Sequence, residues 1–234
     1  MSKPYLSIII PESDGEEKLT LALIKIDEAL QGASFDYEIF VIVSAAAHAN
    51  INFLKLTTFI KNVRYADSES PMYGEKLKIG VQNSSGNIRL LCGGENYYYL
   101  KIFDQFIPSF KSCDIIIGSN ALVGQSYANR FKKLFGSLIF TDRDFIAFKE
   151  EAAMAIFFGL QSKTEAIKLE AHECARKNNY KILAVEYSDP SLASIQIKMP
   201  TLRFLKEAFI IYVMAFGRKL KLKVSAKQKF ERKQ

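Results

Sequence analysis

The chain has 234 residues, of which 49% are hydrophobic and 24% are charged, so it is long enough for one sizeable core and a mostly disordered protein is excluded. Its net charge of +7 resides in residues 218–234, which hold eight of the 32 basic residues and a single acid, while the remainder is neutral. A nucleic-acid-binding domain usually spreads positive charge over a folded face, so a neutral body with a basic tail predicts a local anionic partner other than nucleic acid.

The first part of the chain reads as a strand, a helix and a second strand. Leu6–Ile10 is an almost unbroken apolar run closed by Pro11, which is typical of a strand buried on both faces. After a polar loop, apolar residues recur at helical spacing and end at Gly32; they are Leu19, Leu23, Ile26 and Leu30. Tyr37–Val43 is the second predicted strand. This order is that of a β-α-β unit.

The next segments continue the alternation. Spacing predicts a helix over residues 51–60, a short strand at 63–65, and a helix around Lys76–Val81 that ends at the turn Asn83–Gly86. Ile88–Cys92 and Asp114–Gly118 are two further predicted strands. Residues 144–149 and 180–187 add two more, with a helix between them that carries Ile167, Ala171, Cys174 and Ala175.

Strands that alternate with helices predict an α/β fold with a mostly parallel sheet flanked by helices. In such sheets, ligands collect beyond the carboxyl ends of the strands. Function is therefore expected in the loops that start at residues 11, 43, 93 and 118.

Cysteine usage and the opening residues bear on the compartment. Cys92, Cys113 and Cys174 lack close CxxC spacing, and with two histidines in the chain they do not form a structural zinc site. We expect them to be reduced core thiols. The opening apolar run is too short for a signal peptide, which predicts a cytoplasmic protein.

Five segments in this order resemble the family 2 glycosyltransferases, particularly the branch that makes dolichyl- or polyprenyl-phosphate sugars. The segments are Leu6–Pro11, Tyr37–Ile42, Gly74–Gly80 with Ser84–Asn87, Cys113–Ser119 and, more weakly, Asn179–Val185. The resemblance covers roughly residues 6–187. It implies a GT-A (Rossmann-like) fold over residues 1–200. The spacing and charge of the remaining residues predict an amphipathic helix at 201–223 and a basic tail at 224–234.

The resemblance also implies where a nucleotide-sugar would bind. The family's first loop carries an acid after the strand's proline, so Pro11, Asp14 and Glu16 are candidate nucleotide-binding residues. The alternative is that these acids cap the following helix. The second loop has Ser44 where the family has a carboxylate that reads the base, and His48 is a weaker substitute.

The family's divalent-metal motif, Asp-x-Asp, aligns with Gly93-Gly94-Glu95. Mg²⁺ or Mn²⁺ takes hard oxygen ligands and neutralises the departing diphosphate, so Glu95 is the candidate metal ligand. The alternative is a tight glycine turn in which Glu95 caps the next helix.

Asp142 and Asp144 lie where the lipid-phosphate transferases place their acceptor loop, so they are the candidate catalytic bases. The alternative is a charged turn. Arg130, Lys132 and Lys133 on the preceding helix could meet a phosphate or form a solvated face.

Leu202, Leu205, Phe209, Val213, Phe216 and Leu220 recur three or four residues apart, which predicts one apolar helical stripe. Its longest apolar run, Phe209–Phe216, would span only about 12 Å as a helix, too short for a bilayer core of roughly 30 Å. An amphipathic helix followed by basic residues predicts that residues 202–234 bind an anionic membrane surface from the cytoplasmic side. A protein partner's groove and simple core packing are the alternatives.

Two hypotheses follow. The enzyme hypothesis has the chain transfer a sugar from a nucleotide-sugar to a lipid-phosphate or glycan acceptor with a reduced metal site. The scaffold hypothesis has an inactive relative of these enzymes act as a partner or regulatory subunit, because acids of three motifs are replaced around Gly15, Val43-Ser44 and Gly93.

Overall fold

A computed structural model describes residues 3–12, 16–45, 60, 62–92, 99–120, 145–187 and 202–213. These residues form a seven-stranded sheet with the strand order β3-β2-β1-β4-β6-β5-β7. The strands are β1 (Leu6–Pro11), β2 (Tyr37–Ser44), β3 (Val63–Ser68), β4 (Ile88–Leu91), β5 (Ile115–Asn120), β6 (Phe145–Lys149) and β7 (Ile182–Tyr187). Only β6 runs antiparallel to its neighbours, β4 and β5. The predicted mostly parallel α/β sheet is confirmed.

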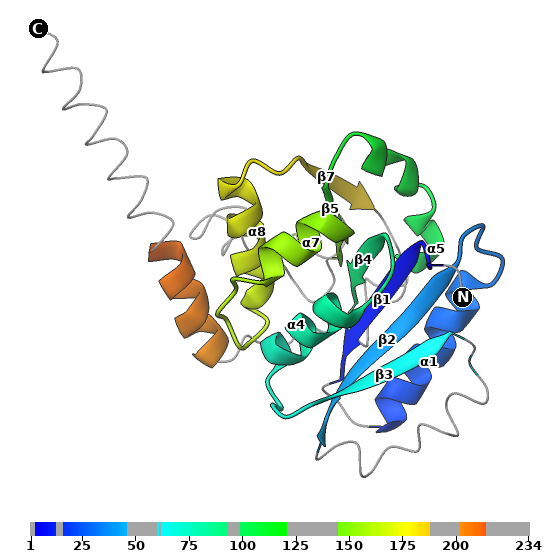
Figure 1. Cartoon of the computed structure of the whole chain (residues 1–234), viewed down its shortest axis with the longest axis horizontal. Helices are drawn as coiled ribbons and strands as arrows, with labels where there is room; N and C mark the ends of the chain where they lie inside the picture. Colours follow the sequence, from blue (N-terminus) through cyan, green and yellow to red (C-terminus); the bar gives the residue numbers. More distant parts are fainter. Residues whose placement is uncertain are drawn as a thin grey trace, which may run out of the picture.

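Helices cover both faces of the sheet (Figure 1). On one face lie α1 (Glu16–Leu30), α5 (Leu100–Phe103) and the 3₁₀ helix η1 (Ile107–Lys111). On the other lie α4 (Tyr73–Asn83), α7 (Glu150–Phe157) and α8 (Ile167–Lys177). A last helix, residues 202–213, lies at the side of the molecule opposite the N-terminal residues (Figure 1).

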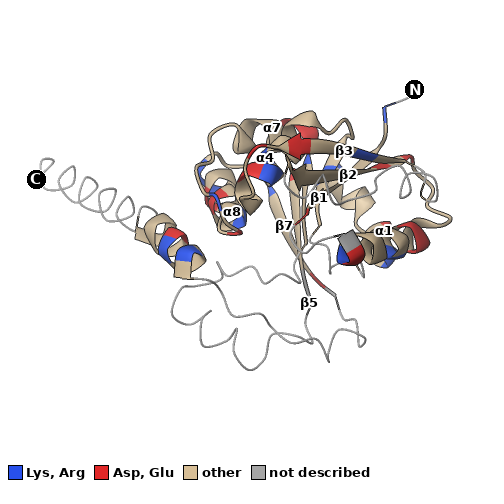
Figure 2. Ribbon diagram, turned by 90° about the horizontal axis from the view of Figure 1, so that it is seen from below, with Lys and Arg blue, Asp and Glu red and all other residues tan. Residues whose placement is uncertain are grey.

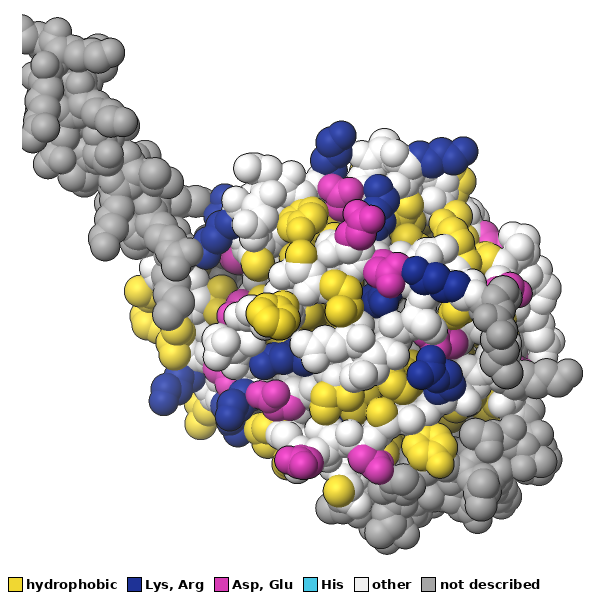
Figure 3. Space-filling model, viewed as in Figure 1, with side chains coloured by type: hydrophobic (Ala, Val, Ile, Leu, Met, Phe, Trp, Pro, Cys, Tyr) yellow, Lys and Arg dark blue, Asp and Glu magenta, His cyan; other side chains and the backbone are white. Residues whose placement is uncertain are grey.

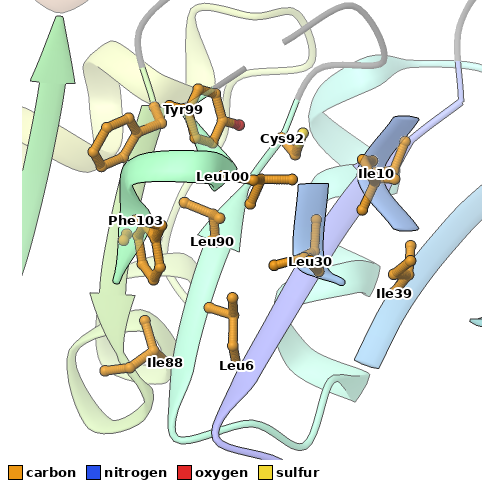
Figure 4. Close-up of a cluster of buried hydrophobic side chains, with 14 of the residues drawn as sticks. Leu6, Ile10, Leu30, Ile39, Ile88, Leu90, Cys92, Tyr99, Leu100 and Phe103 are labelled. Carbon is orange, nitrogen blue, oxygen red and sulfur yellow. The ribbon is translucent and has the colours of Figure 1, made fainter. Parts of the chain in front are cut away.

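The sheet separates two apolar cores because alternate strand residues point to opposite faces. Ile8 and Ile10 of β1 join the core under α1 and α5, whereas Ile9 joins the core under α4, α7 and α8. Figure 4 shows part of the first core, in which Leu6, Leu90 and Phe103 are labelled. Burial on both faces explains why the strands read as continuous apolar runs rather than alternating ones.

Close packing of α4 on the sheet depends on a glycine. A Cβ added at Gly80 would lie 2.4 Å from Ile9 Cγ2 and 2.5 Å from Ile42 Cδ1. The helix axis therefore approaches β1 and β2 more closely than a side chain at this position would permit. This contact fixes the second half of α4 against the two strands.

Most predicted elements are present, with shifted ends. β3 extends to Ser68, three residues beyond the prediction, because it pairs along its whole length with β2. The helix predicted over residues 51–60 falls almost entirely outside the described residues. So does the amphipathic helix beyond residue 213. Within the described part of the chain, no helix combines the length and the hydrophobicity needed to cross a bilayer.

Candidate functional site

The carboxyl ends of β1, β2, β3 and β4 lie along one edge of the sheet, which we call the carboxyl edge; it carries Pro11, Glu12, Ser44, Ser68 and Cys92. In the sheet, β2 and β3 lie on one side of β1, and β4, the next strand in the sequence, lies on its other side. In open α/β sheets, the crevice at such a reversal of strand order is where ligands bind. The candidate site is therefore the end of β1 and β4.

An ion pair is buried at the end of β1. Lys76, in the first turns of α4, places its Nζ 3.5 Å from Glu12 Oε2, and the two side chains are only 4% and 6% exposed. Lys76 Nζ also donates a hydrogen bond to the Glu12 carbonyl oxygen. The Glu12 amide donates to the Ile42 carbonyl at 2.8 Å. The first residue after β1 is thus held to both β2 and α4.

A short turn leads from β3 into α4. The amide of Ser70 donates to Ser68 Oγ at 3.2 Å, and the amide of Met72 donates to Ser70 Oγ at 3.2 Å. The next contact joins α4 to the loop before α8, because the Gly74 amide donates to the Lys163 carbonyl at 2.8 Å. The first turn of α4 and the loop before α8 therefore meet at the carboxyl edge.

A second buried lysine lies at this meeting point. Lys168, in the first turn of α8, is 6% exposed, and its Nζ lies 5.5 Å from the centroid of the Tyr73 ring. Burial raises the pKa of the Cys92 thiol to about 11, while the Tyr99 hydroxyl and the Lys168 ammonium act in the opposite direction. The contact with Tyr73 places Lys168 at the start of α4. Figure 4 shows the Tyr99 hydroxyl turned toward Cys92.

The structure brings two of the predicted site residues to this edge. Pro11 ends β1 and is buried, and Ser44 ends the neighbouring strand β2 and is half-buried. Glu16 is the first residue of α1. The other candidates lie outside the described residues; they are Asp14, Glu95, Asp142 and Asp144. Arg130, Lys132, Lys133 and His48 lie outside them as well.

Among the residues that the structure describes, no group of three or more His, Cys, Asp or Glu side chains is placed to hold a metal ion. The described acid nearest the end of β1, Glu12, pairs with Lys76. A role for Mg²⁺ or Mn²⁺ therefore stays a prediction that depends on Glu95.

Sequence reasoning missed Glu12, Lys76 and Lys168. A signal existed for Lys168, which falls three and seven residues before the buried Ala171 and Ala175 and so lies on the buried stripe of α8. Lys76 similarly precedes the buried Leu77 and Gly80 of α4. A lysine on a buried helical stripe is rare unless it is paired or functional.

A second buried polar cluster lies at the opposite, amino edge of the sheet. Glu38 Oε1 accepts hydrogen bonds from Ser7 Oγ at 2.5 Å and from the Ser85 amide at 2.6 Å, and Arg64 pairs with Oε2 at 2.6 Å. Burial would raise the pKa of Glu38, but these hydrogen bonds outweigh it and hold the pKa below its usual value. The cluster joins β1, β2, β3 and the turn after α4.

Arg89, a residue of β4, extends the polar cluster of the amino edge. Its guanidinium donates to the carbonyls of Val81, Ser84 and Gly86, and it pairs with Glu150 at 3.3 Å. Burial lowers the pKa of Arg89, and the neighbouring Glu150 opposes this shift. The described donors and acceptors of this edge are thus used to hold the fold.

Neither the protein-family models nor the curated proteins include a match to this chain. Solved structures do match. Glucosyl-3-phosphoglycerate synthase from Mycobacterium tuberculosis superposes with a TM-score of 0.67 at 11% identity, over 92% of this chain and 81% of that chain. The same enzyme in complex with Mn²⁺, uridine diphosphate and phosphoglyceric acid gives 0.64 at 11% identity, over 91% and 78%.

A second kind of enzyme also matches. 4-Diphosphocytidyl-2C-methyl-D-erythritol synthase from Anaerococcus prevotii superposes with a TM-score of 0.57 at 13% identity, over 90% of this chain and 99% of that chain. At identities this low the likeness establishes the fold and leaves the activity open. The chain has a GT-A-like α/β fold.

Proposed function

We propose that this chain is a family 2-like glycosyltransferase, which transfers a sugar from a nucleotide-sugar to a lipid-phosphate or glycan acceptor at a membrane surface. The observation that carries the proposal is the buried Lys168 beside Tyr73 at the start of α4, next to the Glu12–Lys76 ion pair at the end of β1. A buried ammonium near a ligand crevice is suited to bind phosphate oxygens through charge-assisted hydrogen bonds.

The structural neighbours support a nucleotide donor. Glucosyl-3-phosphoglycerate synthase has been solved with uridine diphosphate-glucose, Mn²⁺ and phosphoglyceric acid. By analogy, Pro11 and Ser44 would border the nucleotide, together with Asp14 and Glu16, which follow Pro11 in the sequence. Lys168 would neutralise part of the diphosphate charge that grows as the sugar–phosphate bond breaks.

The remaining roles fall to residues outside the described part of the chain. Glu95 would hold Mg²⁺ or Mn²⁺, which when bound would stabilise the leaving diphosphate. Asp142 or Asp144 would accept the proton of a hydroxyl acceptor or orient a phosphate acceptor. These assignments come from the resemblance to family 2 enzymes.

The membrane part of the proposal is supported by helix 202–213. Leu202 is 86% exposed, Phe209 58% and Val213 48%, and hydrophobic side chains gather on the outer side of this helix (Figure 3). The basic residues at 218–234 follow directly in the sequence. An apolar helical face next to basic residues is the pattern that binds anionic bilayers at their interface.

A second candidate function, that of a non-catalytic partner or regulatory subunit, is favoured by one observation. Glu12 is the acid that directly follows β1, and it is buried against Lys76 instead of facing an open loop. A carboxylate held in this way is not free to contact the ribose or base of a nucleotide. The two candidates make opposite predictions for turnover.

Transfer can be tested directly with radiolabelled UDP- and GDP-sugars and vesicles that contain polyprenyl phosphate, in Mn²⁺ or in EDTA. The proposal expects solvent-extractable labelled lipid that is lost in the Asp142→Asn/Asp144→Asn variant. Binding without transfer to lipid or glycan acceptors would favour the non-catalytic subunit. If neither binding nor transfer occurs, the proposal fails.

Lys168→Met supplies the sharper test of the site, and Lys177→Met, at the exposed end of the same helix, is its matched control. Loss of one charge-assisted contact should raise the Kd for UDP or GDP about tenfold or more. Uridine and guanosine, which lack phosphates, should be unaffected. Equal binding of nucleoside diphosphates to both variants would contradict the proposed role of Lys168.

A further inference from the structure

The Glu207 carboxylate of helix 202–213 contacts the loop before α8. Glu207 Oε2 accepts hydrogen bonds from the Lys163 and Thr164 amides, each at 3.1 Å, and from Thr164 Oγ1 at 2.8 Å. The Glu207 side chain is 19% exposed. A residue far along the chain thus accepts hydrogen bonds from the backbone of the loop that leads into α8.

We call residues 161–164 the bracketed loop. Its backbone amides donate hydrogen bonds to carboxylates from two helices. Glu170 of α8 accepts from the Gln161 amide at 3.0 Å and from the Ser162 amide at 2.8 Å, and Glu207 accepts from the next two. Hydrogen bonds to a charged acceptor are about twice as strong as neutral ones. The loop conformation therefore depends on both carboxylates.

The bracketed loop in turn holds the start of α4. The Lys163 carbonyl accepts a hydrogen bond from the Gly74 amide at 2.8 Å. A Cβ at Gly74 would lie 2.4 Å from the Ser162 carbonyl oxygen, so the two backbones are in direct contact. Tyr73, the residue before this contact, places its ring 5.5 Å from Lys168 Nζ.

The loop also holds the start of α8. Thr164 Oγ1 accepts from the Ala166 amide at 3.2 Å while it donates to Glu207, so the same hydroxyl links α8 to helix 202–213. Arg203 adds a second link, because its Nη1 lies 3.0 Å from the sulfur of Met72, just before α4. The ribbon in Figure 2 marks acidic and basic residues on α4, α8 and helix 202–213.

We infer that Glu207 is a positioning residue, which sets the bracketed loop and through it the first turns of α4 and α8 that carry Tyr73 and Lys168. This inference rests on the proposed function only for the ligand concerned, a nucleoside diphosphate. As a consequence, the docking of helix 202–213 on the bracketed loop and the binding of phosphate at the carboxyl edge are energetically coupled.

Hydrogen exchange on the full chain tests the coupling without any ligand. In Glu207→Ala, the amides of Lys163 and Thr164 should exchange about tenfold faster or more, and amides of residues 73–76 and 166–168 should also exchange faster. Glu207→Gln keeps an acceptor and should be intermediate. Lys206→Ala, an exposed neighbour on the same helix, should match the wild type, as should amides at Ser85 and Gly86 on the amino edge.

Nucleotide binding supplies the second readout. The Kd of UDP or GDP should rise about three- to tenfold in Glu207→Ala under conditions in which the chain is fully folded, because a misplaced binding group loses part of its contact. A helix that merely tethers the tail would leave this Kd unchanged. The inference would be overturned if only the amides of Lys163 and Thr164 exchanged faster. In that case the exchange rates at α4 and at the start of α8, and the Kd of the nucleotide, would be unchanged.

The two proposals fail separately. If the wild type binds no nucleotide, the proposed function falls, and hydrogen exchange alone decides the role of Glu207. If nucleotide binds but Glu207→Ala alters neither exchange nor Kd, the inference falls while the proposed function stands.

Discussion

Both edges of the sheet bury polar side chains, but these side chains have different roles at the two edges. At the amino edge, Glu38 and Arg89 have short hydrogen bonds to the chain itself, and these join strands to turns. At the carboxyl edge, Lys76 and Lys168 lie where the strand order reverses, beside a glutamate and a tyrosine ring. Burying a charge is costly unless it is compensated. The first edge is built for stability, whereas the second is placed where a ligand would bind.

The largest expected effect is at the amino edge. Glu38→Ala removes the acceptor of Ser7, Ser85 and Arg64 together. Because three hydrogen bonds to a buried carboxylate are lost at once, we expect a loss of about 4 kcal/mol in the free energy of unfolding. Urea unfolding followed by circular dichroism measures it. The Kd of nucleoside diphosphates should not change in the folded fraction.

Glu38→Gln is the matched control, since it keeps an acceptor oxygen and should recover part of the loss. A change in nucleotide affinity without a loss of stability in Glu38→Ala would break the distinction between the two edges.

The next effect is at the carboxyl edge. Lys76→Met leaves the Glu12 carboxylate buried without its ammonium, which should cost about 3 kcal/mol of stability. The double variant Glu12→Gln/Lys76→Met removes both charges and should regain most of this. Thermal and urea unfolding of the two variants give the comparison. If the double variant is no more stable than Lys76→Met, the pair does not balance its own charge.

The smallest effect concerns pH. Burial lowers the pKa of His172 on α8, against the attraction of Glu173, from an ordinary value of 6.5. The folded state therefore favours the neutral imidazole, so this contribution to stability is present above pH 6.5 and is lost as the pH falls through the lower folded-state pKa. Urea midpoints measured from pH 7.5 down to pH 5 should fall in the wild type.

His172→Gln should flatten the dependence of the urea midpoint on pH between pH 7.5 and pH 5. Glu38→Gln should leave that range unchanged. It should instead alter the urea midpoint near and below pH 4.5, because the pKa of Glu38 is lowered in the folded state. A profile between pH 7.5 and pH 5 that is identical in the wild type and His172→Gln would contradict the assignment to His172.

The order of the elements could be read from the sequence because it depends on local pattern. The predicted strand Leu6–Ile10 forms β1, which also includes Pro11, and the helical spacing from Leu19 to Leu30 falls in α1. A strand buried on both faces must be apolar throughout, and a helix on one face must be apolar every three or four residues. Pro11 and Ser44 lie at one edge of the sheet because the strands that they end, β1 and β2, run parallel.

Other features depended on tertiary structure, because they join residues far apart in the chain. The antiparallel direction of β6 is set by its pairing with β4 and β5, which no local pattern encodes. Glu12 and Lys76 are 64 residues apart, and Glu207 reaches a loop 43 residues earlier. A sequence shows a charged residue, but only the fold decides whether it is buried and which group balances its charge.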